Sequence, residues 1–200
     1  MGKVVAIEHL TLDGVMQSPA RPDEDSRDGF DLGGWANAGN DRAMQQAMGE
    51  RMGASWCLLV GRVTYEDFAG VWPKRTGDPI SEVLNKVEKF VASNTLSEPL
   101  PWQNSTLLNG DAAEKVARLK LERAQNLVIF GSGVLVQSLL RRNLVDEFVL
   151  QIHPLVLGRG RRLFPHGTSE TKLSLVKSQA TATGVIIATY QAAGTADAGR

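Results

Sequence analysis

The fold is decided by the stretch Asn126-Leu-Val-Ile-Phe-Gly-Ser-Gly-Val-Leu-Val-Gln-Ser-Leu-Leu-Arg-Arg142. Its unbroken apolar run, Leu127 to Phe130, is typical of a strand that a sheet buries on both faces. Ser132 follows as a candidate N-cap, and apolar residues at helical spacing begin at Val134. The stretch therefore predicts a buried strand, a turn and a helix in immediate succession.

The turn itself, Gly131-Ser132-Gly133, has two readings. A glycine turn that opens a helix presents backbone N–H groups to an anion such as a phosphate. Two glycines can equally make a tight strand-to-helix connection with no ligand, and the stretch alone leaves both readings open. The turn is not the dinucleotide fingerprint G-x-G-x-x-G, because Val136 takes the place of the third glycine. A nucleotide bound here would need another architecture.

Length and composition indicate one globular domain. The chain has 200 residues, of which 42% are hydrophobic and 22% charged, and these values suffice for a well-buried core. Lys plus Arg is 22 and Asp plus Glu is 22, so the formal net charge is zero. A balanced charge without a basic block argues against nucleic acid as a partner.

Cysteine and histidine usage points away from disulfides and metals. Cys57 is the single cysteine, and His9, His153 and His166 are scattered without metal-ligand spacing, so we expect no metal. The N-terminus has no signal-peptide pattern, and no apolar run is long enough to span a membrane. A cytoplasmic protein without a membrane partner is the expectation.

Strand-like and helical patterns alternate along the chain. We expect strands at 3–12, 56–60, 89–92, 106–108, 127–130, 146–152, 173–179 and 185–191, and helices at 41–52, 64–68, 80–87, 111–123 and 134–142. This order predicts an α/β fold, with a mixed, mostly parallel sheet, helices on both faces and a C-terminal antiparallel hairpin. We expect a single domain over residues 1–191 and a disordered tail over 192–200.

A long irregular segment, Gln17 to Gly39, interrupts this alternation. It is rich in Asp, Gly and Pro, with Phe30 and Trp35 as its main apolar residues. Structureless stretches of this length inside a compact domain are usually functional or disordered. It is either a lid over a site or a surface loop pinned by Trp35.

Small or polar residues follow four of the expected strands. Gly14, Gly61, Ser93 and Gly131 each come just after a strand's carboxyl end. Because ligands of such sheets bind outside the carboxyl ends of the strands, these residues predict a single cleft.

The chain also resembles a known family through an ordered set of segments: Leu12-Asp13-Gly14, Gly61-Arg62-x-Thr64-Tyr65, Ser93, Ile129-Phe130-Gly131-Ser132-Gly133, Asp146-Glu147-Phe148, Pro154, Gly158-x-Gly160 and Leu163-Phe164. Together they resemble the dihydrofolate-reductase-like proteins, and specifically the RibD C-terminal family, the reductase domain of the riboflavin pathway. The resemblance extends from about residue 4 to residue 190.

The resemblance implies a three-layer αβα fold and an NADPH-dependent reductase. It implies hydride transfer to a small heterocyclic or carbonyl substrate, pteridine- or pyrimidine-like, and a homodimer. The cofactor-binding residues carried over from the family are Gly61, Arg62, Thr64, Ser93, Asn94, Gly131, Ser132, Gly133, Val134 and Leu135. Folate reductases have a cis Gly-Gly bond at the glycine turn, to which Gly131–Ser132 would correspond. The alternative function is a nucleotide-binding protein that keeps the cleft but has lost catalysis.

Three residues are candidates for the chemistry itself. Asp13 and Asp41 lie where a carboxyl group could supply the substrate's proton, and Trp35 could exclude water when the loop closes. Each acid also has a structural alternative. Asp13 is a turn residue that can bond its own backbone, and Asp41 follows the potential helix cap Asn40 in a first turn favoured by the dipole. Arg62, likewise, could pair with Glu66 instead of a phosphate.

Overall fold

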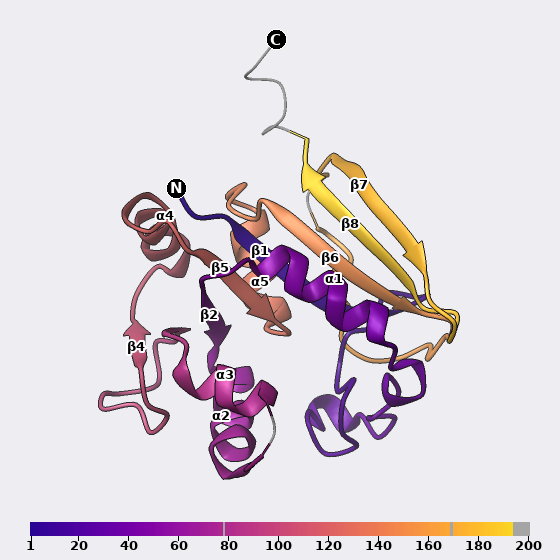
Figure 1. The fold of residues 1–200 in the computed structure, drawn as a ribbon, viewed down its shortest axis with the longest axis horizontal. Coiled ribbons are helices and arrows are strands. Elements are labelled where there is room, and N and C mark those ends of the chain that lie inside the picture. Colours follow the sequence, from indigo (N-terminus) through magenta and orange to yellow (C-terminus); the bar gives the residue numbers. More distant parts are fainter. Residues whose placement is uncertain (78, 169, 194–200) are drawn as a thin grey trace.

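The computed structural model describes residues 1–77, 79–168 and 170–193, and within them eight strands form one sheet. The strand order is β4-β3-β2-β5-β1-β6-β8-β7 (Figure 1). The strands are β1 (Val4–Thr11), β2 (Trp56–Gly61), β3 (Lys89–Ala92), β4 (Ser105–Leu108), β5 (Asn126–Phe130), β6 (Glu147–His153), β7 (Leu173–Ala180) and β8 (Ile186–Ala192). This confirms the predicted α/β fold class.

The sheet is mostly parallel. Every neighbouring pair from β4 through β6 is parallel, whereas β8 runs antiparallel to both β6 and β7. The expected mixed sheet with a C-terminal antiparallel hairpin is therefore confirmed.

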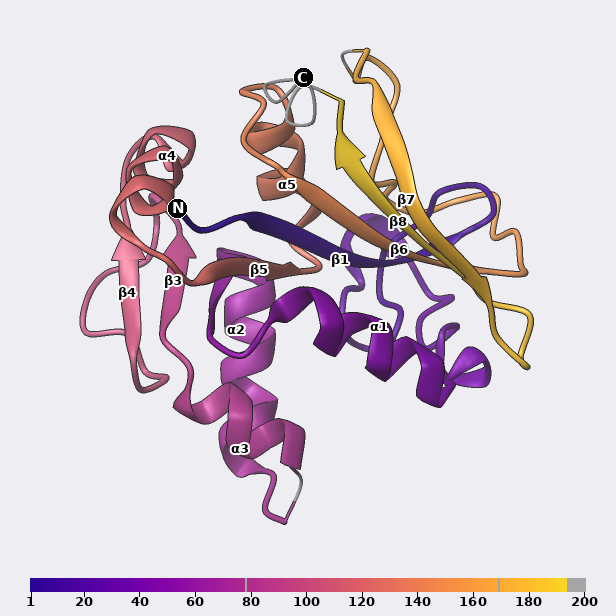
Figure 2. The same ribbon diagram turned by 45° about the horizontal axis from the view of Figure 1, so that its top comes forward.

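Helices cover both faces of the sheet, as Figure 2 shows: α4 and α5 lie on one side, and α1, α2 and α3 on the other. They are α1 (Arg42–Met52), α2 (Arg62–Val71), α3 (Pro79–Lys86), α4 (Ala112–Glu122) and α5 (Gly133–Leu140), with short 3₁₀ turns η1 (Arg27–Gly29), η2 (Asn37–Gly39) and η3 (Trp72–Lys74). The three-layer αβα arrangement is confirmed.

The central strand β1 shows why two helical layers are needed. Val4 and Ala6 pack into a cluster with Val136 of α5, while Val5 and Ile7 pack against Met44 of α1. Successive side chains of a strand point to opposite faces, so an unbroken apolar run must be buried on both sides.

Helix α2 starts two residues earlier than expected, and α1 has a different cap residue. Helix α2 runs over Arg62–Val71 rather than 64–68, because Gly61 is its N-cap and the Tyr65 side chain is buried against the sheet. Helix α1 is capped by Asp41 and not by Asn40, since the Asp41 carboxylate accepts the Ala43 N–H at 2.8 Å.

The C-terminal strand extends slightly into the expected tail. Ala192 still pairs with Leu173, so residue 192 belongs to β8. Residues 194–200 of that tail lie outside the described residues. No helix in the described part of the chain has the length and apolar character needed to cross a membrane.

Candidate active site

The strand ends gather at one edge of the sheet, as predicted. Strands β3, β2 and β5 are parallel neighbours, and Gly61 is level with Ala92 at their carboxyl ends. Ser93 and Gly131 come directly after β3 and β5. The cofactor residues that the family resemblance implied therefore start from the same edge.

The glycine turn adopts a conformation that the sequence did not predict. Gly131 and Ser132 both have left-handed backbones, with φ of 60° and 57°. Ser132 occupies the N-cap position of α5, but its side chain makes no cap bond. Its hydroxyl instead accepts the Gly61 N–H at 3.0 Å and donates to the Thr64 hydroxyl at 2.9 Å. The expected capping role of Ser132 is thus wrong, because the left-handed backbone turns its side chain toward the start of α2.

The peptide bond inside this turn is also not the expected one. Among the described residues, the cis peptide bond is Glu98–Pro99, so Gly131–Ser132 is trans. Two consecutive left-handed residues reverse the chain here instead of a cis bond.

The start of α5 fits a phosphate group. The first N–H groups of a helix have no intrahelical partner, and at Gly133 and Val134 no side-chain cap replaces one. Val134 is 65% exposed, whereas Leu135 is buried beneath it. Gly133 faces Met16 so closely that a Cβ there would lie 2.4 Å from the sulfur. Sequence reasoning missed Met16, which covers the turn from the loop after β1.

Arg62 forms an ion pair with Glu66, which is the alternative to a phosphate contact that the sequence left open. Its Nη1 lies 2.8 Å from Glu66 Oε2, one turn further along α2. The side chains are 46% and 48% exposed. Because exposed pairs of this kind contribute only about 0.3–0.5 kcal/mol, Arg62 can leave Glu66 for a phosphate at little cost.

Ser93 and Asn94 shape the turn after β3. The Ser93 hydroxyl accepts the N–H groups of Thr95 and Leu96, each at 3.1 Å. The Asn94 side chain accepts the Gly110 N–H at 2.6 Å. In the part of the chain that the structure describes, neither side chain bonds to the glycine turn.

Asp13 is held as a carboxylate in a network of donors. The Thr11 hydroxyl donates to it at 2.6 Å, and the Leu157 and Gly158 N–H groups donate at 3.2 Å and 2.9 Å. The Thr11 hydroxyl, followed by these backbone donors, lowers the pKa of Asp13 to about 2. An acid ionised at neutral pH has no proton to give, so the geometry favours the turn-stabilising alternative.

Asp41 is similarly occupied. Besides capping α1, its second carboxylate oxygen accepts the Ala182 N–H at 3.3 Å in the turn between β7 and β8. The helix-terminus alternative is therefore favoured for Asp41 as well.

The 17–39 segment is well anchored. The Trp35 indole donates to the Gln17 carbonyl at 2.8 Å, and its ring lies edge-on to His153 at 5.3 Å. Three ion pairs hold the segment from both sides: Arg21 with Asp67 of α2, Arg159 with Asp31, and Arg161 with Asp28. These contacts place it over the ends of β1 and β6, where a lid would lie.

Beneath this segment is a polar group that sequence reasoning missed. His9 Nδ1 and His153 Nε2 lie 3.0 Å apart, so one ring donates to the other. Burial, reinforced by His153, lowers the pKa of His9 to about 4, and burial also lowers the pKa of His153. Both rings are therefore neutral at neutral pH. Each histidine is a polar residue within an otherwise apolar strand, but nothing in the sequence indicates that the two rings pair.

Glu8, a polar residue within the otherwise apolar strand β1, was also not identified from the sequence. Its side chain is 2% exposed, and Oε1 has no partner among the described residues. Burial raises the pKa of this carboxyl well above its ordinary value, and the Gly131 N–H only partly offsets that effect. A buried acid thus lies against the glycine turn.

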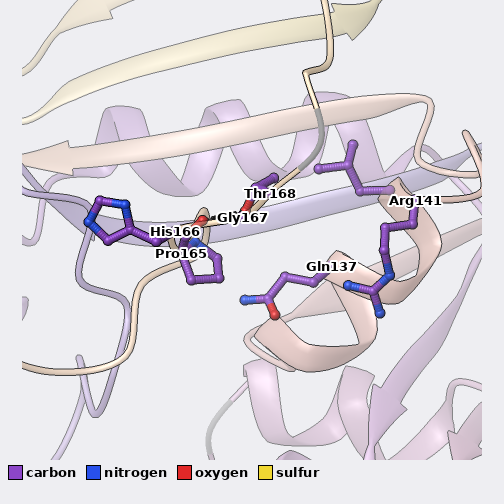
Figure 3. Close-up of a pocket in the computed structure, with 7 residues that line it drawn as sticks. Gln137, Arg141, Pro165, His166, Gly167 and Thr168 are labelled. Carbon is purple, nitrogen blue, oxygen red and sulfur yellow. Dashed lines mark hydrogen bonds between the residues drawn. The ribbon is translucent and has the colours of Figure 1, made fainter.

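Two cavities are present away from the glycine turn. Figure 3 shows the first, of about 100 Å³, between α5 and the loop at 165–168. Gln137 forms part of its wall and donates to the Arg162 and Leu163 carbonyls. The second, of about 200 Å³, lies between residues 17–30 of the 17–39 segment and residues 159–161. None of the residues lining the first cavity belongs to the predicted site.

Comparison with curated proteins finds two sequence relatives. Two curated relatives come from Bacillus subtilis (strain 168), and both are uncharacterized. YyaP is 29% identical over 138 residues, covering 66% of this chain and 72% of YyaP. YwjB is 40% identical over 73 residues, covering 36% of this chain and 42% of YwjB.

Solved structures share the fold at low identity. A putative riboflavin biosynthesis protein from Shewanella sp. PV-4 matches with a TM-score of 0.64, 23% identity and coverage of 96% and 99% of the two chains. Dihydrofolate reductase from Enterococcus faecalis, complexed with NADP(H), matches with a TM-score of 0.58, 14% identity and coverage of 96% and 97%. The model of the RibD C-terminal domain matches residues 3–187. Because this match covers nearly the whole chain, the chain belongs to the RibD C-terminal domain family.

Proposed function

We propose that the protein is an NADPH-dependent reductase that transfers a hydride to a small heterocyclic or carbonyl substrate, pteridine- or pyrimidine-like. The observation that carries this proposal is the bond between the Ser132 and Thr64 hydroxyls. It joins the two segments that bind the cofactor in this family and leaves the start of α5 uncapped for a phosphate.

Each cofactor residue has a definite part in this proposal. The N–H groups of Gly133 and Val134 hold the pyrophosphate, together with the α5 dipole. Arg62 leaves Glu66 and forks onto the adenosine phosphate, which distinguishes NADPH from NADH. Ser93 and Asn94 set the backbone against which that ribose lies. When bound, NADPH supplies the hydride that the reduction requires.

The protein's own contribution to the chemistry is to position the substrate and exclude water. Trp35 lies over His153, so its segment can shield a substrate between β1 and α1. Asp13 is ionised and Asp41 is a helix cap, so we assign neither of them as the proton donor. The proton comes from solvent that reaches the substrate when the segment opens.

The structural bonds of Asp13 and Asp41 support one alternative function. With both candidate acids engaged in structural bonds, the protein could bind the nucleotide without turning it over. Fluorescence titration with NADPH, followed by absorbance of NADPH during incubation with pteridine, pyrimidine and carbonyl compounds, separates the cases. Saturable binding with oxidation supports the reductase, and binding without oxidation by any compound supports the alternative. Absence of binding contradicts both.

We also propose that the protein is a homodimer that pairs through the β7–β8 hairpin. Leu175 and Val176 on the edge strand β7 are 56% and 45% exposed, and Ile186 on the neighbouring strand β8 is 45% exposed. Val185 and Ile187, by contrast, are buried in their own chain. Exposed apolar residues on an edge strand favour pairing with another chain. Light scattering at micromolar concentration should give twice the chain mass, and a monomer would contradict the proposal.

A further inference from the structure

Glu8 of β1 is an acid inside the apolar core. It is 2% exposed, and its Oε1 has no hydrogen-bond partner among the described residues. Its β1 neighbours on the same face, Ala6 and Leu10, belong to the apolar cluster between the sheet and α5, and so does Leu150, which is level with Glu8 in β6. Because an acid is costly to bury in such surroundings, its presence indicates a role that an apolar side chain could not fill.

The Glu8 carboxyl group is bonded to the glycine turn. Strands β1 and β5 are parallel neighbours, and Glu8 lies beside Gly131, the first residue after β5. The Gly131 N–H donates a hydrogen bond to the carboxyl group. The next N–H of the turn, that of Ser132, donates to the Thr64 hydroxyl oxygen at 3.1 Å. The turn is thus held by Glu8 from the sheet and by Thr64 from α2.

The N–H groups of residues 131–134 are therefore divided between two tasks. Those of Gly131 and Ser132 fix the turn, whereas those of Gly133 and Val134 lack a side-chain cap and are the groups to which we assign the pyrophosphate. Glu8 accordingly acts close to the assigned phosphate position. A negative charge on Glu8 would repel a phosphate there, whereas a neutral acid still accepts the Gly131 N–H.

The surroundings of Glu8 favour the neutral acid. Among the described residues, the elements packed around it present apolar side chains to it, such as Ile129 of β5, Leu150 of β6 and Val136 of α5, and no charged group. The adjacent His9 points to the opposite face of the sheet. Burial therefore raises the pKa of the Glu8 carboxyl well above its ordinary value, and the Gly131 N–H offsets this only in part.

We propose that Glu8 is the positioning residue of the glycine turn, and that binding of the cofactor's pyrophosphate requires Glu8 in its neutral form. This proposal rests on the proposed reductase function, since the pyrophosphate is the ligand assigned to the same turn. A bound anion raises the pKa of a neighbouring acid further. At any pH between the pKa of Glu8 in the free protein and its pKa in the complex, binding takes up a proton, and affinity falls by up to about tenfold per pH unit as the pH rises.

Calorimetric titration with NADP⁺, which carries the same pyrophosphate as NADPH, measures this proton directly. Each titration is run in two buffers of different ionisation enthalpy, because the difference in apparent enthalpy gives the number of protons taken up. A range from about pH 5.5 to 9.5 covers the pKa values that buried glutamates reach. The adenosine phosphate of the cofactor also titrates at about pH 6, but that contribution is common to all variants.

Two variants separate the charge of Glu8 from its hydrogen bond. Glu8→Gln keeps an acceptor for the Gly131 N–H without a charge. It should match the wild-type affinity in acid, take up nearly a full proton less at higher pH, and there bind NADP⁺ roughly tenfold tighter than the wild type. Glu8→Leu suits the apolar surroundings but removes the acceptor, and should weaken NADP⁺ binding roughly tenfold even in acid.

The matched control is Glu147→Gln at the start of β6. Glu147 is also buried, but it is paired with Lys3 and lies away from the strand ends that carry the turn. This control should take up as many protons as the wild type at every pH.

Two results would overturn the inference: the same proton count in Glu8→Gln and wild type at every pH, or wild-type affinity in Glu8→Leu. If neither variant folds, the wild type decides alone, since absence of proton uptake at every pH above about 7, where the adenosine phosphate no longer titrates, contradicts the inference. Each of these results leaves NADP⁺ binding and the reductase proposal standing. Absence of NADP⁺ binding by the wild type would instead contradict the proposed function itself, so the two failures are distinguishable.

Discussion

The Ser132 hydroxyl donates a hydrogen bond to the Thr64 hydroxyl at 2.9 Å, although the two residues are 68 positions apart in the chain. The Ser132 N–H donates to the same Thr64 oxygen at 3.1 Å, and the Gly61 N–H donates to Ser132. These bonds couple the glycine turn to the start of α2. The conformation of the turn is thus set by a contact between the two segments to which we assign cofactor binding.

Replacing Thr64 by Val should loosen this coupling. The methyl group keeps the shape of the side chain but removes the acceptor for the Ser132 N–H and hydroxyl. We expect a loss of about 1–3 kcal/mol in the free energy of unfolding, measured in urea, and weaker NADPH binding. Thr64→Ser keeps the oxygen and should restore most of both. An unchanged unfolding midpoint in Thr64→Val would show that these bonds do not set the turn.

Arg62 should decide between the two nicotinamide cofactors. A charge-assisted bond to the adenosine phosphate contributes about 1.5–3 kcal/mol, so Arg62→Ala should weaken NADPH roughly tenfold to hundredfold and NADH far less. Glu66→Gln releases Arg62 from its pair at 2.8 Å and should leave NADPH binding equal or slightly tighter. If Arg62→Ala lost equal affinity for NADPH and NADH in a fluorescence titration, Arg62 would pair with Glu66 and would not contact the phosphate.

Trp35 should affect turnover more than cofactor affinity. Its indole donates to the Gln17 carbonyl, and its ring lies edge-on to His153, where we place the substrate. In Trp35→Ala we expect NADPH affinity close to wild type and a sharp fall in kcat for any accepted substrate. Trp35→Phe keeps the ring over His153 but not the bond to Gln17, and should lie between the two. Wild-type turnover in Trp35→Ala would show that this segment does not close the site.

Glu8 should make stability depend on pH in an unusual direction. Its raised pKa means that the native protein keeps this proton after the unfolded chain has released it. The unfolded state then binds fewer protons, so stability falls as pH rises above about 4.3, the ordinary Glu value, by up to about 1.4 kcal/mol per pH unit. Glu8→Gln removes this loss, and its melting temperature should gain on the wild type from pH 4.5 to 7.

The control for Glu8 is another buried glutamate with a different environment. Glu147 is ion-paired with Lys3 at 2.5 Å, so Glu147→Gln should lower the melting temperature at neutral pH. A pH-independent difference between Glu8→Gln and wild type would contradict the protonated state of Glu8.

Local patterns predicted the fold well and the site only in part. The strand, turn and helix at Asn126–Arg142 follow from a buried apolar run and helical spacing within one short segment. The role of Ser132 does not, since its left-handed backbone depends on Thr64. The His9–His153 pair was likewise out of reach, because its members are 144 residues apart and meet only through the pairing of β1 with β6.

Turn chemistry was predictable where it is local. Asp13 is a structural turn residue, but its main local partner is the Thr11 hydroxyl rather than its own backbone. Its further bonds from the Leu157 and Gly158 N–H groups come from a distant loop. The hairpin at 185–187 was expected to be apolar, but the burial of Val185 and Ile187 beside the exposed Ile186 depends on the packing of this hairpin against α1.

The placement of NADPH at the glycine turn is tested most directly by calorimetric titration of NADPH into wild type, Gly133→Val and Gly70→Ala. A side chain at Gly133 would fill the phosphate approach while displacing only the flexible Met16, so the variant should still fold. Gly70 in α2 has open space around it and serves as the matched control. We predict saturable binding to wild type and Gly70→Ala, and binding weakened roughly tenfold or more by Gly133→Val. NADPH binding of wild-type strength in Gly133→Val, or no binding to the wild type, would contradict the account.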